Sequence, residues 1–247
     1  MADWPRFPNA PITEALLDIK AKLPAGVDLT RLAAFQEAVK DRYPARRERS
    51  SWQGGFQFKP GEVPEVVHPS GGPDGYLFTS GDGQRIVQAR LDGFTFNRLK
   101  PYDKWESFRN EAREQWDRYR EIATPEIVSR VALRYINRLE IPLPMKDFRE
   151  YILTTPEIAP KVPQGLARFF MRLVIPDEKS RSVAIVTQTM EDIQEQVLPL
   201  IFDIDVSREG AFAANGAEMW EVLEQLRDYK NEIFFNSITE KTKELFK

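Results

Sequence analysis

Arginine recurs at every fourth position in one segment of the chain, at Arg130, Arg134 and Arg138, and Arg168 and Arg172 repeat that spacing. The guanidinium fork matches phosphate oxygens, so these five side chains are the candidates for binding a nucleotide or nucleic-acid phosphate. Two other interpretations stay open. The arginines could form a row of exposed ion pairs, or a buried polar interface between halves or subunits.

Two carboxylates stand at alternate positions in Asp203-Ile-Asp205. Alternate residues of a strand point to the same face, so both could reach a hard divalent cation in a metal-dependent hydrolase. Such cations usually take more oxygen ligands than two carboxylates supply, so pairing with arginine is the favoured interpretation.

Other catalytic patterns are scarce. His68 is the only histidine, so a Ser-His-Asp triad would have to use it, and there is no cysteine. The sequence contains no Walker A loop and no GxGxxG pattern. The sequence therefore predicts no catalytic residue set and no cofactor, and it favours a protein that is not an enzyme.

Composition limits the partners. The 247 residues include 35 basic and 38 acidic side chains, so there is no overall field that would attract nucleic acid or an anionic membrane. The N-terminus lacks the basic-then-apolar layout of a signal peptide, and no apolar run reaches the length of a membrane span. We expect a cytoplasmic protein without membrane contact.

Periodicity predicts the elements that position these residues. In the first part of the chain we expect a strand over 12–23, a helix over 28–43, strands over 76–99 with turns at 81–83 and 92–93, and a helix over 103–122. In the second part we expect a strand over 129–142, a short helix over 145–153, strands over 166–176, 182–190 and 197–207, and a helix from 217 to the end.

The same order of elements thus occurs twice. Trp105-Glu106 matches Trp220-Glu221, and Leu23-Pro24 matches Ile141-Pro142. We predict an α+β protein of two similar β-α-β-β-β-α halves, 1–125 and 126–247, that form one compact unit. The halves would build one or two antiparallel sheets with helices on one face, and the arginines and aspartates would occupy the other face.

The last helix carries an apolar stripe that includes Ile233, Phe234, Ile238 and Phe246, and we predict an interface there. Ser237 with Glu240 could cap a new helix inside this segment. The alternative is an unbroken helix with Ser237 facing inward.

Several blocks of the sequence resemble the signature segments of a known family. They are "NAPITEALLDI", "FTFNRLKPY", "LRYINRLEIP", "LIFDIDV" and the closing "LRDYKNEIFFNSITEKTKELF", which together run from Asn9 to Phe246. The family is a sporadically distributed bacterial one of unknown function. The resemblance implies a bacterial or archaeal origin and a single full-length module, and it supplies no catalytic residues.

These observations favour a non-catalytic binding or assembly module that contacts another protein and self-associates as a homodimer. A nucleotide- or nucleic-acid-binding protein that uses the five arginines is the first alternative. A metal-dependent hydrolase that uses Asp203 and Asp205 is the second.

Overall fold

The computed structural model describes residues 4–50, 55–57, 65–67 and 72–247. Its strands are β1 (Ile12–Lys22), β2 (Ala45–Ser50), β3 (Gly55–Gln57), β4 (Glu65–Val67), β5 (Pro73–Thr79), β6 (Arg85–Arg90), β7 (Gly93–Leu99), β8 (Ile127–Pro142), β9 (Phe170–Asp177), β10 (Ser182–Met190) and β11 (Val197–Phe212). Its helices are α1 (Leu29–Ala33), α2 (Phe35–Val39), α3 (Trp105–Ala123), α4 (Glu218–Ser237) and α5 (Glu240–Glu244), with a short 3₁₀ helix at Phe148–Glu150. The predicted α+β class is confirmed.

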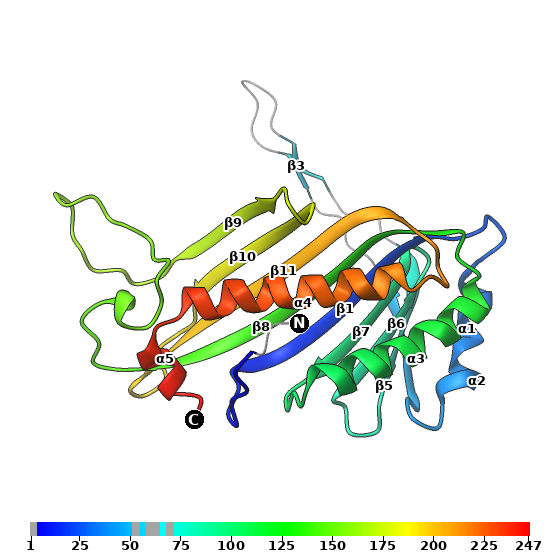
Figure 1. Ribbon diagram of the computed structural model, residues 1–247, viewed down its shortest axis with the longest axis horizontal. Coiled ribbons are helices and arrows are strands. Elements are labelled where there is room, and N and C mark those ends of the chain that lie inside the picture. The colour runs from blue at the N-terminus through cyan, green and yellow to red at the C-terminus, as the bar shows by residue number, and fades with distance from the viewer. Residues whose placement is uncertain (1–3, 51–54, 58–64, 68–71) are drawn as a thin grey trace.

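A single antiparallel sheet of nine strands, in the order β2-β5-β6-β7-β1-β8-β11-β10-β9, forms the centre of the molecule (Figure 1). β1 and β8 lie side by side at its middle, with Leu17 opposite Leu133 and Asp18 opposite Ala132. The sheet is therefore continuous from the first part of the chain to the second. Within the part of the chain that the structure describes, β3 and β4 pair only with each other.

The period-two pattern of β1 has a direct structural counterpart. Ala15, Leu17 and Ile19 are fully buried, whereas the intervening Leu16 and Asp18 are only partly buried. Alternation of this kind puts the two sets of side chains on opposite faces of the sheet, and we call the face that carries Leu16 and Asp18 the open face.

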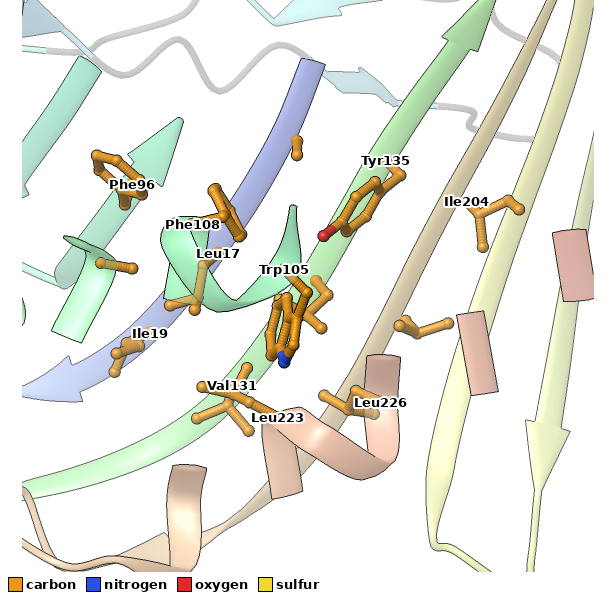
Figure 2. Packing of buried hydrophobic residues seen from close by; sticks show 14 of the residues in the cluster. Leu17, Ile19, Phe96, Trp105, Phe108, Val131, Tyr135, Ile204, Leu223 and Leu226 are labelled. Atoms are coloured by element: carbon orange, nitrogen blue, oxygen red, sulfur yellow. The ribbon is translucent and has the colours of Figure 1, made fainter. Parts of the chain in front are cut away.

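The long helices α3 and α4 pack over the apolar side chains of the sheet (Figure 1). Phe108 of α3 stands against Phe96 of β7 with ring centroids 5.4 Å apart, and Phe234 of α4 stacks on Phe202 of β11 at 6.0 Å. Figure 2 shows Trp105 at the start of α3 among the buried apolar side chains, with its ring centroid 6.0 Å from that of Phe108. Among the helices in the described residues, none has the length and apolar character needed to cross a membrane.

Two elements in the first part of the chain differ from the sequence prediction. The helix expected over 28–43 is two short helices, because the backbone N–H of Ala34 bonds back to Arg31 and tightens the chain there. β5 begins at Pro73, before the predicted start at Tyr76, and includes Gly75. A Cβ at Gly75 would lie 2.3 Å from the Ala89 carbonyl oxygen, so the close approach of β6 requires glycine.

The C-terminal segment is interrupted, as one of our two alternatives predicted, but the cap is a different residue. α4 ends at Ser237, and Ile238 is extended and forms an isolated bridge with Ile152. Thr239, not Ser237, caps α5 by accepting a hydrogen bond from the Thr242 backbone N–H.

Candidate functional site

The open face carries a network of arginine and aspartate side chains at the centre of the sheet. We call Asp18, Arg90, Arg130, Arg134, Asp203 and Asp205 the arginine–aspartate network. β1, β6, β8 and β11 contribute these residues, and the register aligns them on one face, with Arg134 directly opposite Asp205. The predicted placement of Arg130 and Arg134 beside the two aspartates therefore holds.

Arg134 binds Asp203 through two parallel contacts. Its Nε donates to Asp203 Oδ1 at 2.9 Å and its Nη2 donates to Asp203 Oδ2 at 2.6 Å. This fork-to-fork geometry raises the pKa of Arg134 further above its ordinary value. Asp203 is only 8% exposed, so the guanidinium replaces water as the partner of its carboxylate.

Asp18 joins two arginines from different strands. It accepts a hydrogen bond from Arg90 Nη1 at 2.7 Å, and Arg130 Nη1 lies 3.3 Å from its other oxygen. Arg130 also reaches Asp205 at 3.6 Å. Burial raises the pKa of Asp205 because desolvation outweighs the attraction of Arg130 and Arg134.

These ion pairs affect the two chemistries that the sequence suggested, namely phosphate binding by the arginines and metal binding by Asp203 and Asp205. Each arginine in the network already faces a carboxylate, so a phosphate would have to displace an internal partner to bind there. Both carboxylate oxygens of Asp203 accept hydrogen bonds from Arg134, so a metal ion would likewise have to displace an internal partner. The described residues contain no group of three or more His, Asp or Glu side chains placed to hold a metal ion.

The other predicted arginines lie away from this network. Arg138 pairs with Glu140 and with Glu191, the latter at 3.1 Å. Arg172 is exposed on β9, on the same face, and pairs across the sheet with Thr187. Arg168 precedes β9, where it contacts Asp192, so the expectation that a strand holds it on the sheet face was wrong.

The predicted C-terminal interface is mostly internal. Phe234, Ile238 and Phe246 are 7%, 3% and 3% exposed, and Ile233 is partly buried against the same core. The ring of Phe7 packs on Phe246 with centroids 5.4 Å apart, so the N-terminal segment covers the stripe. The apolar pattern reported an intramolecular contact, because periodicity cannot identify which surface a stripe meets. His68 lies outside the described residues.

An apolar surface that the sequence reasoning missed lies at the β9 end of the sheet. The register puts Phe170, Val174, Val183 and Ile185 on the open face, and we call these four residues the β9 patch. Phe170 is 70% exposed and Val174 is 55% exposed. The available signal was the run "FMRLVIPD", in which Arg172 is the only charged residue before the final Asp177.

No protein-family model matches the chain, and no curated protein matches it significantly.

Proposed function

We propose that the protein is a non-catalytic binding and assembly module that self-associates through β9. The observation that carries this proposal is an edge strand with exposed apolar side chains, Phe170, Val174 and Ile175. β9 is the last strand of the sheet and has β10 as its only strand partner among the described residues. In Figure 1, α4 lies over β8 and β11, and β9 stands at the outer edge of the sheet. Within the described residues, the only hydrogen bond from α4 to β9 is that of the Tyr229 hydroxyl to the Ile175 carbonyl, at 3.3 Å.

The two edges of the sheet have opposite character. β2, at the other end, has the sequence "ARRERS", in which four of six residues are charged. Charged side chains on an edge strand disfavour pairing with another chain, which is the usual protection of such edges. β9 has fewer charges, with Arg172 as its only charged residue before the closing Pro176-Asp177, and it adds exposed Val174 on one face and exposed Ile175 on the other.

A second copy of the chain is the partner that fits this edge. Two β9 strands related by a two-fold axis would pair antiparallel and extend the sheet across both copies. Such pairing keeps equivalent residues on equivalent faces, so the two β9 patches would join into one apolar surface. A register with Val174 opposite Val174 of the second copy puts Arg172 opposite Pro176, without contact between like charges.

Light scattering coupled to size-exclusion chromatography tests this proposal at micromolar concentration. We expect a dimer for the wild-type chain and a monomer for Val174→Lys, because lysine on an edge strand opposes strand pairing. Leu153→Lys is the matched control, since Leu153 is 59% exposed but lies outside the β9 patch. A wild-type monomer, or a Val174→Lys variant that remains dimeric, would contradict the proposal.

We further propose that the halves 1–125 and 126–247 are structural repeats whose helices share one face of the sheet. The strand order supports this: β7, β6 and β5 follow β1 outward as β11, β10 and β9 follow β8, and each half ends in a long helix. The backbone N–H of Asn9 donates to the Phe246 carbonyl at 3.0 Å, so the ends can be joined. We expect a circular permutant that begins at Glu126, with the original ends joined, to fold. A permutant that does not fold would contradict the structural repeat.

We assign this module to the cytoplasm. Disulfides do not persist in that reducing compartment, and a chain without cysteine does not depend on them.

A further inference from the structure

A small cavity lies on the helix side of the sheet, remote from the arginine–aspartate network. Its walls come from the N-terminal segment, the start of α3, β8 and α4, and its volume is about 130 Å³. Seven of its lining residues are aromatic, namely Trp4, Phe7, Tyr102, Trp105, Tyr135, Phe234 and Phe235.

Lys230 of α4 brings a buried amino group to this cavity. Lys230 is only 8% exposed, and its Nζ lies 3.9 Å from the centroid of the Tyr135 ring and donates to Asn231 Oδ1. No carboxylate of the described residues lies within 4 Å of this nitrogen. A buried ammonium without a counter-ion is costly, and such groups are rare unless they are paired.

A second positive charge increases this imbalance. Arg227 stands one helical turn before Lys230, 15% exposed, with its guanidinium 5.9 Å from the centroid of the Trp105 ring. Arg6 and Lys104 also line the cavity, and Asp103 is the only acidic lining residue. Asp228 lies 3.9 Å from Arg227 but also accepts a hydrogen bond from Trp4, so it compensates Arg227 only weakly.

The protonation of Lys230 follows from these surroundings. Burial, and to a smaller extent the charge of Arg227, lower the pKa of Lys230 to about 7. The hydroxyls of Tyr102 and Tyr135 hydrogen-bond to each other at 2.9 Å, and burial raises the pKa of both, so neither supplies a negative charge at neutral pH. A negative charge brought by a ligand would favour the protonated lysine.

We propose that this cavity binds a small organic carboxylate, with its carboxylate on Lys230 and Arg227 and a flat apolar body between the aromatic walls. A carboxylate would supply the counter-ion that protonated Lys230 lacks, and the surrounding walls limit the size of the ligand. The rings favour an acid with an aromatic or branched apolar group over inorganic phosphate, which has no apolar part to bury.

Isothermal titration calorimetry of the full chain with benzoate tests this assignment, with benzamide and inorganic phosphate as comparison probes. We expect benzoate to bind and both comparison probes to bind at least tenfold more weakly. At about pH 8 the lysine is largely neutral before binding, so the benzoate heat should depend on the ionisation enthalpy of the buffer and indicate proton uptake.

Two variants separate the site from the fold. Lys230→Met preserves side-chain length, removes the charge and should reduce benzoate affinity at least tenfold while the chain remains folded by circular dichroism. Lys241→Met is the matched control: Lys241 also stands over a tyrosine ring, that of Tyr151, but has Glu150 as its partner, and benzoate affinity should not change. If Lys230→Met does not fold, Arg227→Gln replaces it as the test variant and should likewise reduce benzoate affinity.

Failure of benzoate to bind the folded wild-type chain at millimolar concentration would overturn the proposal. Equal affinity for benzoate and benzamide, or unchanged affinity in a folded Lys230→Met variant, would also overturn it.

Discussion

At the scale of single residues, Lys230 has an unusual environment, because its buried amino group hydrogen-bonds to an amide and stands over an aromatic ring, and burial lowers its pKa. Its pKa is about 7 in the folded protein and about 10.4 in the unfolded chain. Between these values the unfolded chain binds more protons. The stabilisation that neutral Lys230 permits is therefore complete above the unfolded pKa and is lost as pH falls through about 7.

We expect Lys230→Met to be more stable than the wild-type chain at neutral pH, with a difference that shrinks as pH rises. The reason is that methionine removes the cost of a buried ammonium and leaves no group to titrate. Urea unfolding of both chains between about pH 7 and pH 9.5 measures this, below the range in which tyrosines of the unfolded chain ionise. A stability difference independent of pH would show that Lys230 is not buried and neutral.

Arg134 tests whether the arginine–aspartate network is a structural ladder. Arg134→Ala leaves the carboxylate of Asp203 buried without its partner, and we expect it to destabilise the fold by about 1–3 kcal/mol in urea unfolding. Arg172→Ala removes an exposed arginine that forms no ion pair within the described residues and should change stability by less than about 0.5 kcal/mol.

The double variant Arg134→Ala, Asp203→Asn completes a cycle for this pair. It should cost less than the sum of its single changes, because both members of one contact are removed together. Additive costs would mean that the two side chains do not interact.

At the scale of elements, the break between α4 and α5 shows how a tertiary contact sets a helix boundary. Ile238 leaves helical geometry to bridge Ile152, and the Thr239 backbone N–H donates to the Tyr151 carbonyl at 3.0 Å. The segment near the 3₁₀ helix therefore supplies backbone hydrogen-bond partners to Ser237 and Thr239. An unbroken helix would not form these bonds.

The hydroxyl of Thr239 anchors this junction. It donates to the Glu150 carbonyl at 2.6 Å and accepts from the Thr242 backbone N–H at 3.3 Å. Thr239→Ala should cost about 1–2 kcal/mol in chemical unfolding. Ser237→Ala is the control and should change stability by less than about 0.5 kcal/mol. A larger effect at Ser237 would restore it as the cap.

At the scale of the whole molecule, the two halves share structure that neither can provide alone. β1 pairs with β8 along most of its length, and Glu224 of α4 accepts a hydrogen bond from Trp105 of α3 at 2.8 Å. Separating the halves would expose two central strands and break this helix contact.

We therefore expect one cooperative unfolding transition, with equal calorimetric and van 't Hoff enthalpies in a scanning calorimetry experiment. A calorimetric enthalpy near twice the van 't Hoff value would instead indicate two halves that unfold independently.

Local pattern in the sequence predicted much of the architecture. The strands that became β1, β8, β10 and β11 and the helix that became α3 follow from periodicity, because alternation and helical spacing are properties of neighbouring residues. The same alternation assigned Arg130, Arg134, Asp203 and Asp205 to one face. The turn near Asp92-Gly93 was also predicted, because glycine adopts positive φ at little cost. In the structure Gly93 has a φ of 145°.

The tertiary structure alone decided which partners these residues have. Leu226, Lys230 and Phe234 follow one another at helical spacing, so the sequence contained a lysine within an apolar stripe, but only the fold buries it against Tyr135. The contact between Phe7 and Phe246 and the pairing of Arg134 with Asp203 join residues far apart in the chain. Periodicity reports which face of an element is apolar, whereas the neighbour of that face depends on chain topology.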